Sequence, residues 1–253
     1  MWGRLHWCRN ASLAVAAVIV SVIFATTLAL AQDNDRQTCM QLSDPDRSIP
    51  ACTRIIDAKP QNQSELADIY LFRASAYRDK KQTEAALRDL DAALRLNPNL
   101  VDAYVVRGTV QLVTNHPDDA IKDLSSALRL NPNHAEAHRQ RAAAYTMKRD
   151  LPAAIRDLDE IIRIEPRSAA AHYQRGIALG LSGQPERAFA DFDMTVKLQP
   201  ENPMGLTALG QAYVEGAGVA KNPERGIELL RKAARTGFPP AKEVLAKLGQ
   251  PAQ

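Results

Sequence analysis

The sequence predicts an all-α fold, an α-solenoid of stacked antiparallel helix pairs. Four prolines, Pro98, Pro132, Pro166 and Pro200, each lie 34 residues from the last. Small and apolar residues recur with the same period between them. Such a period is typical of arrays in which each repeat is one helix pair that packs on its neighbours. Numbering each repeat so that its proline is position 32 places four repeats at 67–100, 101–134, 135–168 and 169–202.

Residues 1–31 have the organisation of a signal peptide. Basic residues at the start precede an apolar run from Ala11 to Leu30, and Ala29-Leu30-Ala31 matches a small-residue cleavage site. Cleavage after Ala31 would deliver the rest of the chain to the periplasm or outside the cell. The alternative is an uncleaved membrane anchor facing the periplasm, because the apolar run approaches the ~20 residues that span a bilayer.

Residues 32–66 are interpreted as a degenerate first repeat stapled by a disulfide. Ala51, Ile55 and Ala58 reproduce the spacing of positions 20, 24 and 27, and Cys39 and Cys52 fall at positions 8 and 21, on the side where the two helices meet. Export to an oxidising compartment predicts a bond between these cysteines. The alternative, a reactive or metal-binding thiol pair, has no Cys-x-x-Cys spacing or nearby histidine to support it.

The four repeats of residues 67–202 share small residues at positions 8 and 20 and a large apolar residue at position 24. Small residues let two helices touch, and the larger residue fills the space between repeats. The residue before each proline ends the second helix, because proline disfavours the helical backbone there. These positions are Ala74, Gly108, Ala142 and Gly176 (8), Ala86, Ala120, Ala154 and Ala188 (20), and Leu90, Leu124, Leu158 and Phe192 (24).

This pattern resembles the tetratricopeptide repeat (TPR) family, and the resemblance covers residues 67–202 without a gap. It implies a right-handed superhelix whose concave face binds other proteins. Residues 203–238 resemble the related Sel1-like repeat, on Gly216-Ala217-Gly218-Val219 and on Lys232-Ala233-Ala234 followed by Gly237. Residues 239–253 are expected to form a one-sided capping helix and tail, with the apolar face Ala241, Val244, Leu245 and Leu248.

Each central repeat also has an arginine at position 7 and an aspartate at position 23. The arginines could grip acidic side chains of a partner, but we favour ion pairs within the protein, because guanidinium suits partly buried bidentate pairs. Histidines at position 4 replace the tyrosines of earlier repeats, so we interpret them as packing residues and not as metal ligands. These residues are Arg73, Arg107, Arg141 and Arg175, Asp89, Asp123, Asp157 and Asp191, and His138 and His172.

No sequence pattern points to catalysis. A nucleophile elbow, a phosphate loop, a dinucleotide fingerprint and a zinc-protease motif are all missing from the sequence. We therefore predict that the protein is not an enzyme and has no catalytic residue, cofactor, metal or small-molecule substrate. Two of the 32 basic residues and none of the 29 acidic ones lie in residues 1–31, which leaves a formal charge of +1 after cleavage. Nearly balanced, interleaved charges argue against a nucleic-acid partner, and membrane contact is expected only if residues 1–31 are retained.

The TPR resemblance implies that positions 2, 5, 9 and 12 of each first helix line the partner-binding face. Leu71 and Ser75 stand where chaperone-binding members have a Lys and Asn clamp for a terminal carboxylate, so this clamp is absent. The face suits an extended or helical peptide with apolar anchors; the alternative is a face with no dedicated ligand. The candidate partner-binding residues are Leu71, Ser75, Val105, Thr109, Leu112, Arg139, Ala143, Tyr173 and Ile177.

The function predicted from these observations is an exported, non-catalytic scaffold that binds a protein or peptide on its concave face. The alternative is an adaptor or regulatory subunit of an envelope protease or cell-wall enzyme. The two differ in whether a catalytic partner co-purifies with the protein.

Overall fold

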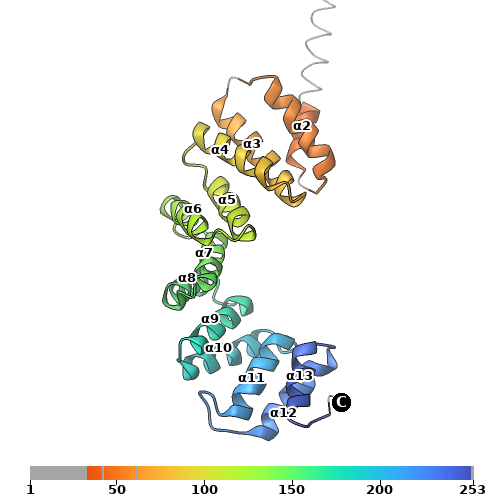
Figure 1. The fold of residues 1–253 in the computed structure, drawn as a ribbon, viewed down its shortest axis with the longest axis vertical. Helices are drawn as coiled ribbons and strands as arrows, with labels where there is room; N and C mark the ends of the chain where they lie inside the picture. The colour runs from red at the N-terminus through yellow and green to blue at the C-terminus, as the bar shows by residue number, and fades with distance from the viewer. Residues whose placement is uncertain (1–32, 42, 61, 252–253) are drawn as a thin grey trace, which may run out of the picture. The chain divides into compact units, whose positions relative to one another are not determined.

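The computed structural model describes residues 33–41, 43–60 and 62–251, and within them it shows α-helices and no β-strand (Figure 1). The predicted all-α fold is therefore confirmed. The predicted signal peptide, residues 1–31, lies outside the described residues. No helix of the described part of the chain is long and apolar enough to cross a membrane.

The chain divides into two compact units, and the boundary between them in the sequence lies between Val106 and Arg107. Residues 33–40 are helical and precede the helices of the first unit. The helices are α2 (Pro45–Asp57), α3 (Gln63–Asp79), α4 (Thr83–Leu96), α5 (Val101–Val113), α6 (Pro117–Leu130), α7 (Ala135–Met147), α8 (Leu151–Ile164), α9 (Ala169–Leu181), α10 (Pro185–Leu198), α11 (Pro203–Glu215), α12 (Pro223–Arg235) and α13 (Pro239–Lys247).

The first unit contains the predicted disulfide between Cys39 and Cys52. Both cysteines are fully buried and pack with Ala51, Ile55 and Ile69, so the bond lies in a small apolar core that joins the N-terminal helices to α3. Helices α3 and α4 pack on each other as a pair.

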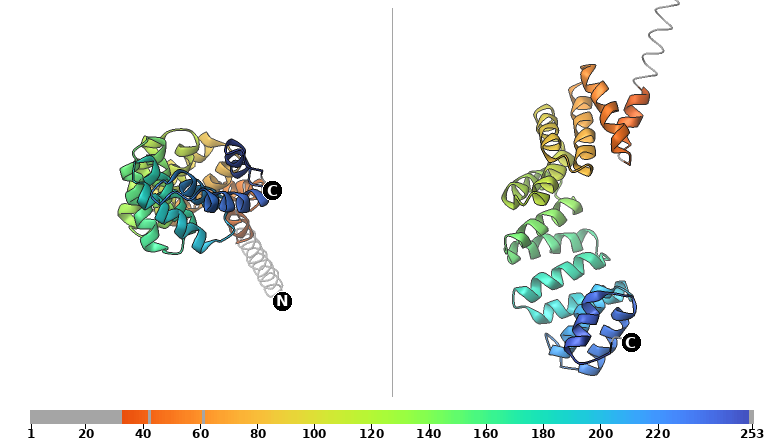
Figure 2. Two further views of the ribbon diagram at one scale, coloured as in Figure 1. Left: turned by 90° about the horizontal axis from the view of Figure 1, so that it is seen from below. Right: turned by 45° about the vertical axis from the view of Figure 1, so that its right-hand side comes forward.

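In the second unit consecutive helices pack on one another, and α6 to α10 lie side by side in the right-hand view of Figure 2. Position 8 lies where the two helices touch, as predicted, but it meets position 24 of its own repeat, the residue that was expected to fill the space between neighbouring repeats. A methyl group added at Gly108 would lie 2.8 Å from the side chain of Leu124, and one at Gly176 would lie 2.6 Å from that of Phe192. These approaches are closer than ordinary van der Waals contact, so glycine is required where these helices touch.

The helix boundaries follow the sequence signals. Helices α4, α6, α8 and α10 end two residues before the repeated prolines. Asp150 caps α8 by accepting a hydrogen bond from the Ala153 amide at 3.1 Å, and Pro117 and Pro185 lie in the first turn of their helices.

One backbone feature was not predicted from the sequence. The residue at position 15, between the two helices of each central repeat, has a left-handed backbone, with φ of 58° at Lys81, 63° at Asn115, 59° at Arg149 and 75° at Gly183. This conformation costs lysine or arginine about 1–2 kcal/mol relative to glycine. The packing of the two helices therefore imposes a tight turn that the side chains at this position do not favour.

Helices α11, α12 and α13 occupy the residues for which a Sel1-like repeat and a capping helix are predicted. The turn after α11 includes Gly218, which has a φ of 72° and lies so close to α10 that an added methyl group would be 2.1 Å from the Pro185 carbonyl oxygen. Helix α13 buries Ala241 and Leu245, but it ends at Lys247. Leu248 is therefore exposed beyond the helix and does not join the buried face.

Candidate functional site

The second unit has an apolar pocket of about 430 Å³ between α7 and α9. Helix α8 contributes one buried residue, Leu158, and the other side chains come from the two first helices of consecutive repeats. The lining residues are Arg139, Ala142, Ala143 and Thr146 of α7, Leu158 of α8, and Tyr173, Gln174, Ile177, Ala178 and Leu181 of α9.

The spacing of these residues along α7 and α9 places their side chains on one face of each helix. Residues three and four apart share a helix face, and Tyr173, Ile177 and Leu181 follow each other at intervals of four on α9. On α7, Ala142 and Ala143 stand between the longer side chains and leave space that a larger residue would fill. The pocket therefore forms where alanines of α7 face an apolar row of α9.

Tyr173 is the aromatic wall of this pocket. Its ring is half-buried and packs against Phe192 of α10, with ring centroids 6.1 Å apart and planes tilted by 49°. Burial raises the pKa of the Tyr173 phenol, so the side chain is neutral under physiological conditions. Ile177 and Leu181 are 38% and 68% exposed, which is unusual for aliphatic side chains and extends the apolar surface to the rim.

The charged residue among those that line the pocket is Arg139. Arg139 donates hydrogen bonds to Glu136 of its own helix and, at 3.4 Å, to Glu165. Gln140 also donates to Glu136, at 2.6 Å. Arg139 is therefore already engaged within the protein.

The structure brings four of the nine candidate residues together: Arg139, Ala143, Tyr173 and Ile177 all line the pocket. Leu71 and Ser75 of α3 and Val105 of α5 are instead buried in the structure. Thr109 and Leu112 lie part-buried on α5, away from the residues that line this pocket.

Thr146 is at position 12, one of the positions expected on the partner-binding face, whereas sequence reasoning missed Leu181 and Gln174 as pocket residues. A signal for Leu181 existed, since position 13 is apolar in three consecutive repeats, at Val113, Met147 and Leu181, and all three are exposed at the ends of their helices.

The arginines of position 7 form the predicted ion pairs inside the protein. Each donates two hydrogen bonds to the position-23 aspartate of its own repeat, at 2.7–2.8 Å. Arg141 also donates to Ser125, and Arg175 to Asp159, in the preceding repeat. Although burial alone would raise the pKa of Asp157, hydrogen bonds from Arg141 and His138 hold it below its ordinary value. The arginines therefore stabilise and join repeats.

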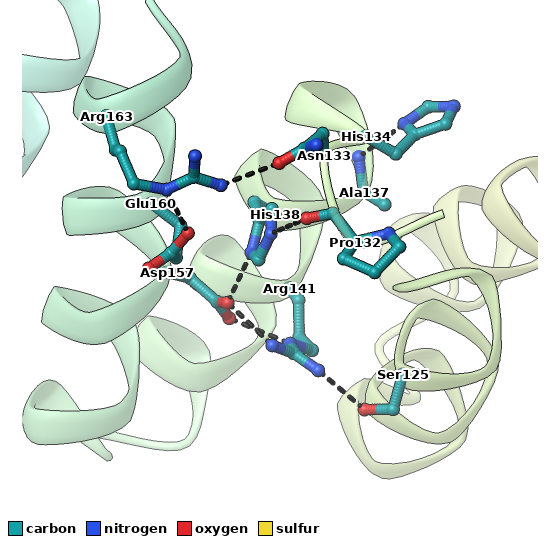
Figure 3. Close-up of polar contacts among 10 residues, drawn as sticks. All are labelled: Ser125, Pro132, Asn133, His134, Ala137, His138, Arg141, Asp157, Glu160 and Arg163. Atoms are coloured by element: carbon teal, nitrogen blue, oxygen red, sulfur yellow. Dashed lines mark hydrogen bonds and ion pairs between the residues drawn. The ribbon is translucent and has the colours of Figure 1, made fainter. Parts of the chain in front are cut away.

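The histidines of position 4 do more than pack. His138 is buried and lies between two acceptors, the Asp157 carboxylate and the Pro132 carbonyl (Figure 3). His172 has the same arrangement with Asp191 and Pro166. The interpretation of these residues as packing substitutes was therefore incomplete. Within the described residues, no cluster of three or more histidine, cysteine, aspartate or glutamate side chains could hold a metal ion.

Tetratricopeptide repeats are recognised over residues 67–100, 105–169 and 148–203, which together make up more than half of the chain. The chain belongs to the tetratricopeptide repeat family. No curated protein sequence matches it. The TPR fold is a protein-interaction scaffold that presents extended binding surfaces, so the pocket is a candidate protein-binding site.

Solved structures of TPR proteins share this fold. The crystal structure of MamA is 25% identical over 69% of this chain and 96% of its own, with a TM-score of 0.59. YrrB, described as a TPR protein with an unusual peptide-binding site, is 21% identical over 77% of this chain and 97% of its own, with a TM-score of 0.63. The C-terminal part of a TPR protein from Cytophaga hutchinsonii is 16% identical over 86% of this chain and 80% of its own, with a TM-score of 0.68.

Proposed function

We propose that this TPR protein is an exported, non-catalytic scaffold that binds a protein or peptide partner in the pocket between α7 and α9. The observation that carries the proposal is the pocket itself. It offers about 430 Å³ of mainly apolar space, with exposed Ile177 and Leu181 at its edge. Pockets of this size and character receive apolar anchor side chains, which supply most of the binding energy of protein interfaces.

The state of Arg139 defines the partner further. Because Arg139 is held by Glu136 and Glu165, it is not available as a clamp for a terminal carboxylate. The mainly apolar lining favours a partner segment with a large apolar side chain. This chemistry differs from that of the chaperone-binding TPR proteins, as the missing Lys and Asn clamp also indicates.

A pair of matched variants tests the binding site. Ile177 in the pocket and Met194 on α10 outside its lining are both 38% exposed. Ile177→Glu should weaken partner capture from envelope extracts by about 30-fold or more, the loss expected for a central anchor contact, whereas Met194→Glu should leave it unchanged. Equal capture by the parent and both variants, with unchanged thermal unfolding, would exclude this pocket as the binding site.

Export is proposed from Ala29-Leu30-Ala31 and is supported by the buried disulfide, a bond that persists in oxidising compartments. The intact mass of protein purified from the cell envelope tests it. We expect a chain that begins at Gln32. Retention of residues 1–31 would instead favour the membrane-anchored alternative.

A further inference from the structure

We propose that His138 is an imidazolium ion in the folded protein and acts as a positioning residue that fixes α7, one wall of the pocket, so that rising pH loosens this helix. The effect on partner binding rests on the proposed function. The effect on the fold does not.

At each histidine, both ring nitrogens lie close to an oxygen atom. Nδ1 of His138 lies 2.7 Å from Oδ1 of Asp157, and Nε2 lies 3.0 Å from the carbonyl oxygen of Pro132. At His172 the corresponding distances, to Asp191 and Pro166, are 2.9 and 3.3 Å. A carbonyl oxygen only accepts hydrogen bonds, so Nε2 must carry a hydrogen to bond it.

Asp157 is in the ionised form, which also only accepts, because hydrogen bonds from Arg141 and His138 lower its pKa although burial raises it. Asp157 receives two hydrogen bonds from Arg141, at 2.7 and 2.8 Å, and Asp191 receives two from Arg175 at the same distances. Nδ1 of His138 must therefore donate as well. A ring with a donated hydrogen bond at both nitrogens carries two hydrogens and a positive charge.

Other charged groups surround each histidine. Near His138 these are Arg141 on its own helix, Arg129 of α6, and Glu160 and Arg163 of α8, which line the same surface cavity. Figure 3 shows Arg141, Glu160 and Arg163 around the ring. Burial and the charge of Arg141 lower the pKa of His138, but the hydrogen bonds to Asp157 and the Pro132 carbonyl outweigh them and raise the pKa.

His172 faces Asp191 of α10 and Arg175 of its own helix, and Arg175 is in turn paired with Asp159 of α8.

The two hydrogen bonds of each histidine ring connect three segments of the chain. His138 ties α7 to α8 through Asp157 and to the turn after α6 through Pro132; His172 ties α9 to α10 and to the turn after α8. A neutral ring has one hydrogen and can keep only one of the two bonds. Loss of the proton therefore releases either the neighbouring helix or the preceding turn.

The direction of the pH dependence follows from the raised pKa of His138 in the fold. The stabilisation is complete below the unfolded-state value of about 6.5 and is lost as pH rises through the higher folded-state value. The first two repeats have Tyr70 and Tyr104 at this position, and the Tyr70 ring stacks with Arg73 at 5.6 Å. We therefore expect the pH dependence in the repeat of His138, residues 135–168.

The test uses the exported chain and the tyrosine substitution that the chain itself offers. Nitrogen chemical shifts of the His138 imidazole ring, followed by NMR from about pH 6 to about pH 9, should show the ring doubly protonated at the acidic end. A neutral His138 ring at that end would overturn the proposal without any variant. The melting temperature of the parent should also fall over this range by about 2–4 °C more than that of His138→Tyr/His172→Tyr. The exposed His116→Tyr is the control and should follow the parent.

Parallel melting profiles of parent and double variant would likewise overturn the proposal. Partner capture should weaken with rising pH in the parent and become pH-independent in the double variant. If the double variant keeps the parental pH dependence of capture, the positioning role is wrong. If no partner binds the pocket in any protein, only the proposed function fails, because the NMR and melting results stand by themselves.

Discussion

Replacing Arg73 by alanine removes the guanidinium that neutralises a buried carboxylate. Asp89 is 6% exposed, and Arg73 donates to both of its oxygens, at 2.7 and 2.8 Å. Arg73 also donates to Thr53 of α2 at 2.9 Å, so it connects three helices of the first unit. The substitution therefore leaves a negative charge inside the protein and removes a contact to the N-terminal repeat.

The magnitude follows from this geometry. Breaking a buried ion pair by removing one partner costs about 3–5 kcal/mol, because the remaining charge is desolvated without compensation. The Arg73 side chain is 15% exposed, so water reaches part of the pair and the lower end of the range, about 3 kcal/mol, applies. For a chain of this size, the melting temperature should fall by about 6–12 °C.

The assay is urea unfolding followed by far-ultraviolet circular dichroism, with hydrogen exchange to locate the effect in α2 to α4. Arg78→Ala is the matched control, since Arg78 lies on the same helix and pairs with Asp79 at the surface. Its loss should change the free energy of unfolding by less than about 1 kcal/mol. The double variant Arg73→Ala/Asp89→Ala should recover part of the loss, because it also removes the buried charge.

Two results would refute this reasoning. If Arg73→Ala unfolds like Arg78→Ala, the buried pair does not carry the stability assigned to it. If Arg73→Ala keeps its stability and yet loses partner capture, the arginine row serves binding, which was the alternative interpretation of the sequence pattern.

Three further predictions concern packing and the disulfide. Gly176→Ala should destabilise the fold by about 1–3 kcal/mol in thermal unfolding, because the new methyl group would lie 2.6 Å from Phe192. Reducing the Cys39–Cys52 bond should increase hydrogen exchange in residues 33–60 while the repeats from 67 onward stay protected, because a loop of this length is worth roughly 3 kcal/mol. Gly218→Ala should increase exchange in α11 and α12, since it combines a φ of 72° with a clash of 2.1 Å against a backbone oxygen.

Each of these has its own control. Gly180→Ala should be tolerated, since the nearest atom to its methyl group is 3.8 Å away, and Phe192→Leu should rescue Gly176→Ala. Gly237→Ala has a φ of 88° with open space around it, so it separates backbone strain from the Gly218 clash. Uniform deprotection of the whole chain on reduction would contradict a local role for the disulfide.

Several features of the fold were predictable because they depend on residue type at a fixed period. The four prolines end α4, α6, α8 and α10, since proline constrains the backbone next to it wherever it occurs. The small residues at position 8 and the pairing of position 7 with position 23 also recur at constant spacing. A period of 34 residues repeats the same neighbours each time, so one alignment of the repeats predicts all of these contacts.

The tertiary structure alone decided where the pocket between α7 and α9 forms. Leu71 and Arg139 hold the same position in their repeats, yet Leu71 is buried and Arg139 lies at a cavity. The reason is that a cavity depends on the volumes of side chains from three helices at once, here Ala142 and Ala143 against Tyr173. The charge of His138 depends in the same way on a carboxylate and a carbonyl 19 and 6 residues away in the chain. Periodicity identifies which residues share a face, but only the packed helices determine the space and the acceptors that each side chain meets.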